Sequence, residues 1–321
     1  MIVALAGGVG GAKLAQGLYR ALPPDTLVVV GNTADDFVHF GLPISPDLDT
    51  VMYTLAGIAN PATGWGVVDD TFQALDLLGR YGAETWFRVG DRDFATHVRR
   101  AELLRAGRTL TAVTAALADG LGVRARLLPM CDEPVATVVT TPAGDLPFQE
   151  YFVRRQHQDE VGGVRFAEIE RATLPSGVAN ALATAEAIVL CPSNPLVSLG
   201  PILAVPGCRE ALRAAPGVKV AVSPIVGGRA LKGPADRMLA GLGHDVSPVG
   251  VAALYRDFLD GFVLDEEDRA LAPRVEALGL PALVAQTVMG GPEDRERLAQ
   301  EIVQFARGLA GRRPADCTRA G

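Results

Sequence analysis

Four apolar, strand-like runs in this chain each end in a loop of glycines or small polar residues. In open parallel sheets, ligands bind outside the carboxyl ends of the strands, where backbone groups are free to donate hydrogen bonds. Two such strand–loop pairs lie in each half of the chain, so the sequence predicts an α/β fold with a nucleotide or polyphosphate site. The runs are residues 2–6, 27–30, 187–190 and 218–222, and the loops are residues 7–11, 32–36, 192–195 and 223–228.

Composition narrows the class of protein. The 321 residues are 49% hydrophobic and 21% charged, which is typical of a globular chain, and the net charge of -7 argues against broad binding to nucleic acid or anionic membranes. No export signal and no apolar stretch of the ~20 residues needed to span a bilayer is visible, so we expect a cytoplasmic protein. The cysteines show no C-x-x-C spacing and are expected to be reduced thiols: Cys131, Cys191, Cys208 and Cys317.

Alternation of helical and strand-like patterns predicts a Rossmann-like, mostly parallel sheet with helices on both faces. The first helix is expected across residues 13–19. Aspartates are plausible helix caps, with Asp69 or Asp70 for the helix near 69–80 and Asp91 for the helix near 92–106. Further helices are expected near residues 49–56, 110–119 and 292–309.

The pattern changes at about residue 125. Short strands separated by turns are expected at residues 126–128, 136–140 and 148–153, which predicts a small antiparallel insertion over residues 125–172. The nucleotide-binding core then comprises residues 1–124 and 173–310. The tail, residues 311–321, is expected to fray.

The first loop, GGVGGAK over residues 7–13, stands at a strand-to-helix turn. Glycines there allow close approach of a phosphate, and a helix N-terminus favours an anion. The loop is neither a Walker A motif nor the dinucleotide G-x-G-x-x-G, and it can also be merely a tight turn. The expected phosphate-binding residues are Gly8, Val9, Gly10, Gly11 and Lys13.

Two acidic pairs follow the second strand. Asp35 and Asp36 come directly after it, and Asp47 and Asp49 lie at the start of the next helix. Carboxylates at a helix N-terminus are often simple caps. Beside a polyphosphate, the same residues can hold Mg2+, which prefers one or two carboxylates plus phosphate oxygens and water. Asp49 is the strongest single candidate.

Arg88 and Arg92 flank a further polar segment, which continues to Asp93 and His97. One interpretation is a capped helix with an Asp93–His97 pair on one face. The other is that the arginines orient a phosphate or a polar edge of a ligand, and we favour it modestly.

The second half of the chain supplies more hydrogen-bond donors. Ser193 and Asn194 lie between two prolines, Ser198 precedes a helix, and Gly227 and Gly228 precede another. Proline at the start of a helix is also an ordinary N-terminal signal, so these segments can be purely structural. No G-x-S-x-G or H-E-x-x-H motif occurs, which argues against a serine triad or a zinc hydrolase.

Together these segments resemble the 2-phospho-L-lactate transferase family, which assembles the deazaflavin coenzyme F-420. The resemblance runs in order from residue 2 to about residue 305. Its motifs are GGVGGAKL (7–14), NTADD (32–36), SPDLDTVMY (45–53), GWG (64–66), GDRDFATH (90–97), CPSNP (191–195), SLGPI (198–202) and the segment 223–235.

The resemblance implies a Mg2+-dependent transfer. The ribityl 5′-hydroxyl of 7,8-didemethyl-8-hydroxy-5-deazariboflavin (Fo) would attack a guanosine diphospho-donor, and GMP would leave. It places Fo near Asp49 and Arg88, and Asp47, Thr50 and Arg92 are expected to join them. It places the guanine nucleotide over the glycine-rich loop and the Pro-Ser-Asn-Pro segment, and Asn32 is expected to take part. Asp35 and Asp49 are the expected catalytic and Mg2+-holding pair, and a homodimer is plausible.

Two other classes remain open. A regulator of related fold would bind a nucleotide sugar without turning it over, and a nicotinamide dehydrogenase is disfavoured by the glycine pattern. The donor also stays open. The lactyl, enolpyruvyl and glyceryl groups differ only slightly, and contacts in the pocket worth only ~1–3 kcal/mol are enough to discriminate between them.

Overall fold

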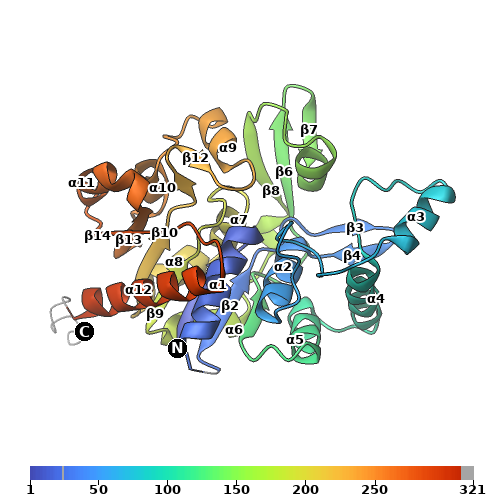
Figure 1. Ribbon diagram of the computed structural model, residues 1–321, viewed down its shortest axis with the longest axis horizontal. Helices are drawn as coiled ribbons and strands as arrows, with labels where there is room; N and C mark the ends of the chain where they lie inside the picture. The colour runs from blue at the N-terminus through green and yellow to red at the C-terminus, as the bar shows by residue number, and fades with distance from the viewer. Residues whose placement is uncertain (24, 312–321) are drawn as a thin grey trace.

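The computed structural model describes residues 1–23 and 25–311, and its centre is a seven-stranded parallel sheet (Figure 1). The predicted α/β fold with helices on both faces is confirmed. Cys317 and all of the expected frayed tail except Gly311 lie outside the described residues. The strand order is β14 (Ala282–Ala285), β13 (Gly261–Asp265), β10 (Val218–Val222), β9 (Ala187–Leu190), β1 (Ile2–Ala6), β2 (Leu27–Gly31) and β5 (Arg126–Pro129).

Each face of the sheet carries its own apolar core, because successive side chains of a strand point to opposite faces. In β1, Val3 and Leu5 belong to one core and Ile2 and Ala4 to the other. The second face is covered by α1 (Gly8–Ala21), α2 (Pro46–Leu55), α5 (Leu110–Gly120) and α12 (Pro292–Ala310). The first is covered by α6 (Ser176–Thr184), α7 (Leu199–Ala204), α8 (Cys208–Ala214), α10 (Pro248–Tyr255) and α11 (Ala272–Glu276).

The strand order reverses direction at β1. The chain goes from β1 outward to β2 and β5, and then returns to β9 on the other side of β1. Loops that follow β1, β2 and β9 therefore converge at one point of the sheet edge, which is where open α/β sheets bind ligands.

A separate lobe projects from the β2 side of the sheet (Figure 1). It contains the hairpin of β3 (Phe37–His39) and β4 (Leu42–Ile44) and the helices α3 (Gln73–Arg80) and α4 (Asp91–Arg105). The aspartates cap the opposite helices from those predicted: Asp91 caps α3, and Asp70 caps α4. Asp70 accepts hydrogen bonds from the amides of Arg92 and Asp93 in α4, and Asp91 accepts from those of Gln73 and Ala74 in α3.

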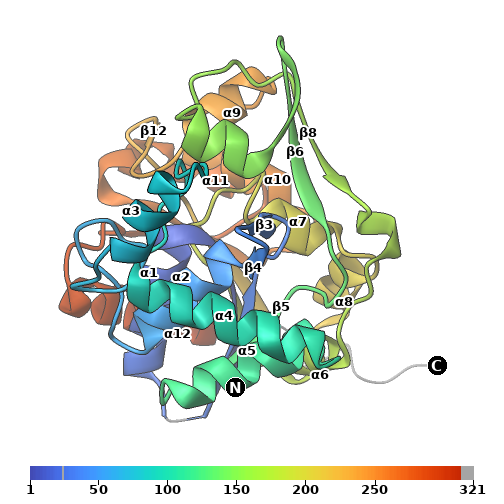
Figure 2. The same ribbon diagram turned by 90° about the vertical axis from the view of Figure 1, so that its right-hand side faces the viewer.

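The antiparallel segment differs from its prediction in two places. Residues 126–129 form β5, which pairs parallel with β2 in the main sheet. The antiparallel sheet consists of β7 (Gly144–Pro147), β6 (Ala136–Thr141) and β8 (Gly163–Ala167), and it rises above the main sheet in Figure 2.

The predicted strand at residues 148–153 is wrong: this segment is helical and includes the π-helix η1 (Glu150–Arg154). Phe148 and Tyr151 lie three residues apart and bury against one small core, a helical and not a strand spacing.

The short elements that complete the second half of the chain are η2 (Ile169–Arg171), β11 (Ile225–Val226), β12 (Arg229–Ala230), α9 (Ala235–Gly241) and η3 (Glu266–Leu271).

None of the helices in the described part of the chain is both long and apolar enough to cross a membrane.

Candidate functional site

One amide side chain joins the loops that converge beside β1. Asn32, directly after β2, is completely buried, and its Nδ2 lies 3.0 Å from Asp35 Oδ2, 3.0 Å from Asp47 Oδ2 and 3.2 Å from the carbonyl of Val197. These partners come from the loop after β2, from the start of α2 and from the segment after β9. The sheet edge therefore brings together residues that lie up to 165 positions apart in the sequence.

The glycine-rich loop packs too closely for side chains. A Cβ on Gly10 would lie 2.3 Å from the carbonyl oxygen of Pro192, and one on Gly11 would lie 2.4 Å from Ser193 Oγ. Gly8 adopts the left-handed region with φ of +61° at the first residue of α1. The loop thus needs its glycines both for this turn and for contact with the segment after β9.

The N-terminus of α1 already has acceptors inside the protein. The amide of Gly8 donates to Asp47 Oδ1 at 2.8 Å, and the amide of Gly7 donates to Ser193 Oγ at 3.1 Å. A carboxylate is favoured there by the partial positive charge of the helix end. A ligand phosphate at this loop would therefore share the helix N-terminus with Asp47.

Asp35, Asp36 and Asp47 form a buried acidic cluster. Burial raises the pKa of Asp35 well above its usual range, and the charge of Asp47 raises it further. Burial also raises the pKa of Asp36 strongly, although a 2.6 Å hydrogen bond from Ser45 Oγ opposes the shift. For Asp47, burial raises the pKa to about 6 against the hydrogen bonds from Asn32 and Gly8. Burial thus opposes the ionisation of all three carboxyls.

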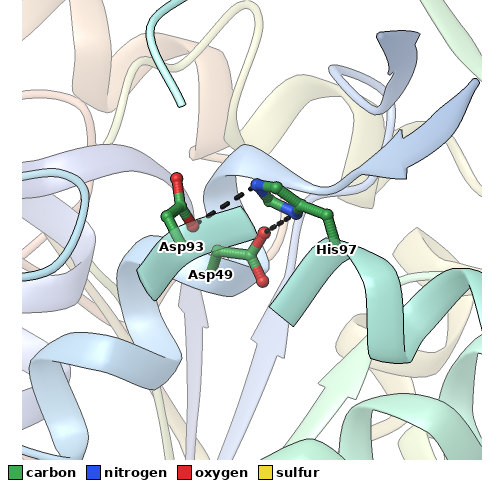
Figure 3. Close-up of side chains that lie close together, drawn as sticks. All are labelled: Asp49, Asp93 and His97. Carbon is green, nitrogen blue, oxygen red and sulfur yellow. Dashed lines mark ion pairs between the residues drawn. The ribbon is translucent and has the colours of Figure 1, made fainter. Parts of the chain in front are cut away.

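Asp49 differs from these neighbours, because it has a cationic partner. It lies in the first turn of α2 and forms a buried ion pair with Arg100 Nη2 of α4. His97 Nδ1 lies 3.7 Å from Asp49 Oδ2, and His97 Nε2 lies 3.3 Å from Asp93 Oδ1 (Figure 3). The i,i+4 pair of Asp93 and His97 that the sequence suggests is therefore present, and it contacts Asp49.

Two groups of side chains have the chemistry to hold a metal ion. In the acidic cluster, Asp35 Oδ1 and Asp36 Oδ1 are buried and have no hydrogen-bond partner among the described residues. Asp49 Oδ2 is also buried and has no hydrogen-bond partner among the described residues. Carboxylate oxygens without a hydrogen-bond partner suit Mg2+, which takes hard oxygen ligands. The acidic residues therefore have the ligand chemistry that this ion prefers.

The second group is Asp49, Asp93 and His97, whose ligand atoms lie within 4.8 Å of one another. A cation among them would have to compete with Arg100, whose guanidinium contacts both Asp49 and His97. Like charges at such distances repel strongly in a buried site. Arg100 therefore opposes a cation at this group, although among the described residues it is the group whose ligand atoms lie that close together.

Of the other residues expected near Fo, the two arginines lie on the lobe. Arg88 stacks over the ring of Phe72 at 4.2 Å, and Arg92 Nη1 donates to the carbonyl of Val68. Thr50 is buried one residue after Asp49. The arginines thus have structural contacts of their own, and Thr50 and Asp47 share the first turns of α2 with Asp49.

Lys13 lies farther along α1, within a group of cations. Its Nζ donates to the carbonyl of Met289 at 2.8 Å. Burial lowers its pKa, and the charges of Arg295 and Lys232 lower it further. Lys232 in turn donates to the carbonyl of Thr63, and Gly64 packs against Val9 in the glycine-rich loop. These cations give the first turns of α1 a positive flank.

The donors predicted in the second half are only partly free. Asn194 Oδ1 accepts from the amides of Leu196 and Val197, and so closes its own turn. Ser193 and Ser198 both pack against Gly7. The amide of Gly227 donates to Asp268 Oδ2 at 3.0 Å, and Gly228 follows it with φ of +75°. Ser193 and Ser198 thus join the glycine-rich loop, whereas the Gly227 amide has a partner elsewhere.

Sequence reasoning missed Arg100 and Tyr53. Arg100 follows His97 by three residues on α4, and Tyr53 follows Asp49 by four on α2, so each shares a helix face with a residue already singled out. That spacing is the signal available in the sequence. It does not reveal that the two faces meet.

Comparison with known proteins identifies the family. The model of the family described as 2-phospho-L-lactate transferase CofD matches residues 2–280. The chain is 40% identical over 303 residues to a 2-phospho-L-lactate transferase of Methanosarcina mazei, covering 94% of this chain and 99% of that protein. It is 42% identical over 311 residues to a phosphoenolpyruvate transferase of Streptomyces griseus, covering 95% and 98%.

A solved structure agrees with the fold. A UPF0052 family protein from Bacillus halodurans superposes with a TM-score of 0.65 at 15% identity, covering 94% of this chain and 98% of that one. At such low identity the likeness concerns the fold alone. The family match and the relatives agree with the resemblance drawn from the sequence motifs, and the chain belongs to the 2-phospho-L-lactate transferase CofD family.

Proposed function

We propose that the protein transfers a phospholactyl, phosphoenolpyruvyl or phosphoglyceryl group from a guanosine diphospho-donor to Fo, in the biosynthesis of coenzyme F-420. The family match over residues 2–280 is the observation that carries the proposal. Relatives of nearly equal similarity are named for two different donors, phospholactate and phosphoenolpyruvate. The donor is therefore the first thing to measure.

The site geometry supports a reaction that depends on positioning and charge. Phosphoryl-type transfer needs little covalent help from protein; it needs alignment and neutralisation of charge. The donor diphosphate would bind at the glycine-rich loop, flanked by Lys13. The oxygen of the ribityl 5′-hydroxyl would form the new bond to phosphorus, the bond to GMP would break, and the hydroxyl proton would pass to a carboxylate of the site.

The acidic residues would divide two tasks. Asp35 and Asp36, with Asp49 Oδ2, have the open oxygens that would hold Mg2+. When bound, the ion would neutralise negative charge on the diphosphate. Asp49 would also orient the ribityl hydroxyl, and Arg88, with Arg92, would hold the deazaflavin on the lobe side.

A mass-spectrometric assay tests this function. Purified protein is incubated with Fo, Mg2+ and each of the three guanosine diphospho-donors in turn. A phosphodiester-linked Fo product with equal release of GMP would establish the reaction and name the donor. Folded protein that forms no product from any donor, yet binds a nucleotide sugar, would favour a non-catalytic regulator instead.

Variants test the residue roles. Asp49→Asn should lower turnover by orders of magnitude while the fold is kept, and an unchanged rate would remove Asp49 from the site. Arg88→Ala should weaken Fo binding more than nucleotide binding, and equal weakening would contradict separate placement. Arg105→Ala, an exposed arginine in the last turn of α4, is the matched control.

Asp35→Asn should weaken Mg2+ binding by at least tenfold in isothermal titration calorimetry, because it removes one charge and one open oxygen. Unchanged affinity would move the ion away from Asp35. A homodimer is also part of the proposal, and light scattering during gel filtration tests it.

A further inference from the structure

Arg100 is a charged side chain in an unusual place. It is only 2% exposed and ranks first by volume among the fully buried side chains of the described residues. Burying a guanidinium is costly unless its charge is paired and its N–H groups are bonded. Here Nη2 pairs with Asp49, and Nη1 lies 3.0 Å from His97 Nδ1 and 3.4 Å from the carbonyl of Pro43.

The contacts of Arg100 fix the state of His97. A guanidinium nitrogen can only donate, so His97 Nδ1 must accept this hydrogen bond. The ring proton then resides on Nε2, which faces Asp93 Oδ1 at 3.3 Å. The imidazole thus accepts from a cation on one side and faces a carboxylate on the other.

Two helix faces meet in this network. On α4, His97 and Arg100 follow Asp93 at helical spacing. On α2, Tyr53 follows Asp49 by four residues, and its hydroxyl donates to Asp93 Oδ1 at 2.7 Å. A continuous chain of contacts thus runs from Tyr53 through Asp93, His97 and Arg100 back to Asp49, as Figure 3 shows for three of its members.

From this arrangement we infer that Arg100 and His97 are positioning residues for Asp49. Arg100 engages Asp49 Oδ1, and His97 holds the guanidinium in place and faces Oδ2 at 3.7 Å, so both oxygens of the carboxylate are oriented from α4. The inference rests on the proposed function, because it gives Asp49 a role toward the deazaflavin. It adds that the position of the Asp49 carboxylate is set by α4, on the lobe, and not by the sheet edge.

The test separates hydrogen bonding at Nδ1 from packing. His97→Leu keeps an apolar volume but removes the atom that accepts from Arg100. His97→Asn restores a carbonyl oxygen near the position of Nδ1. Arg99→Met, on the exposed side of the same helix, is the control, since Arg99 pairs at the surface with Glu102.

Steady-state kinetics with Fo varied and then with the donor varied gives the readout. For His97→Leu we expect kcat/KM for Fo to fall tenfold to a hundredfold, as for loss of a hydrogen bond to a charged group, with KM for the donor within twofold of the parent. His97→Asn should recover most of the loss. Equilibrium dialysis should show that His97→Leu binds Fo most weakly and that His97→Asn binds Fo almost as well as the parent.

Arg100→Lys keeps the buried charge and provides a second route if His97→Leu does not fold. It should fold and show the same selective loss toward Fo, because a lysine cannot span both Asp49 and His97 with a planar fork. An unchanged kcat/KM for Fo, or equal losses toward Fo and donor, would overturn the inference. A parent protein that neither binds Fo nor forms product would instead refute the proposed function.

Discussion

The acidic cluster makes a quantitative prediction about how stability depends on pH. The pKa of Asp47 is about 6 in the folded protein, against about 3.9 for an unfolded chain. The folded state therefore binds more protons between these values, and it loses stability as the pH rises through them. Ionising Asp47 in the folded protein costs roughly 3 kcal/mol by pH 7.5, and roughly half of this cost is already present at pH 5.

The substitution Asp47→Asn removes this titration. Asn keeps an oxygen that can accept from Gly8, and any loss of hydrogen bonding with Asn32 is the same at both pH values. The stability of the variant relative to the parent should therefore rise by roughly one to two kcal/mol between pH 5 and pH 7.5. The assay is urea unfolding at both pH values, with EDTA present so that no divalent cation offsets the charge.

Asp91→Asn is the control without a pH dependence in this range. Hydrogen bonds from Thr71 and from the backbone lower the pKa of Asp91, so the stability that it contributes is complete above about pH 5 and its removal should cost the same at both pH values. If Asp47→Asn showed the same pH dependence as the parent, the carboxyl would not be a destabilising buried charge. The physical argument for a cation at this cluster would then fail with it.

Three further predictions concern the rest of the chain. Gly10→Ala should prevent stable folding or lower Tm by well over 10 °C, because its Cβ would overlap the carbonyl of Pro192, whereas Gly120→Ala has open space and should leave Tm unchanged or higher in the same thermal scan. Asp70→Ala should destabilise by about 1 kcal/mol in urea unfolding, since it removes the acceptor for two amides of α4; an effect below 0.3 kcal/mol would contradict the cap. Burial raises the pKa of Cys131 to about 11 and that of Cys208 to about 12, so peptide mass spectrometry should find both unalkylated by iodoacetamide at pH 8 until the protein unfolds.

Much of the sheet could be predicted because its strands are buried on both faces. Fully apolar runs such as β1, β2 and β10 have few alternatives when glycine loops and helical patterns surround them. The segment at residues 148–153 was predicted as a strand because its aromatic and β-branched residues favour strands locally. The packing of Phe148 and Tyr151 into one small core overrides that preference.

The loops that form the site could be predicted from the sequence, but the contacts between their side chains could not. Asn32, Asp35 and Ser193 are expected at the site because they follow strands, and Asp47 because it begins a helix; the topology does bring them together. The partner of Asp49 could not be selected in the same way. Arg100 lies 51 residues away on a helix outside the sheet, and its spacing from His97 does not reveal that this face of α4 meets α2.

The exchanged caps of α3 and α4 bear on how the lobe folds. The first turn of each helix depends on an aspartate that lies outside that helix, so neither helix can complete its hydrogen bonds while the other is unfolded. Residues 70 to 105 should therefore open and close as one cooperative unit in amide hydrogen exchange. Since His97 and Arg100 belong to that unit, a fluctuation that starts near Asp91 would also release the carboxylate of Asp49.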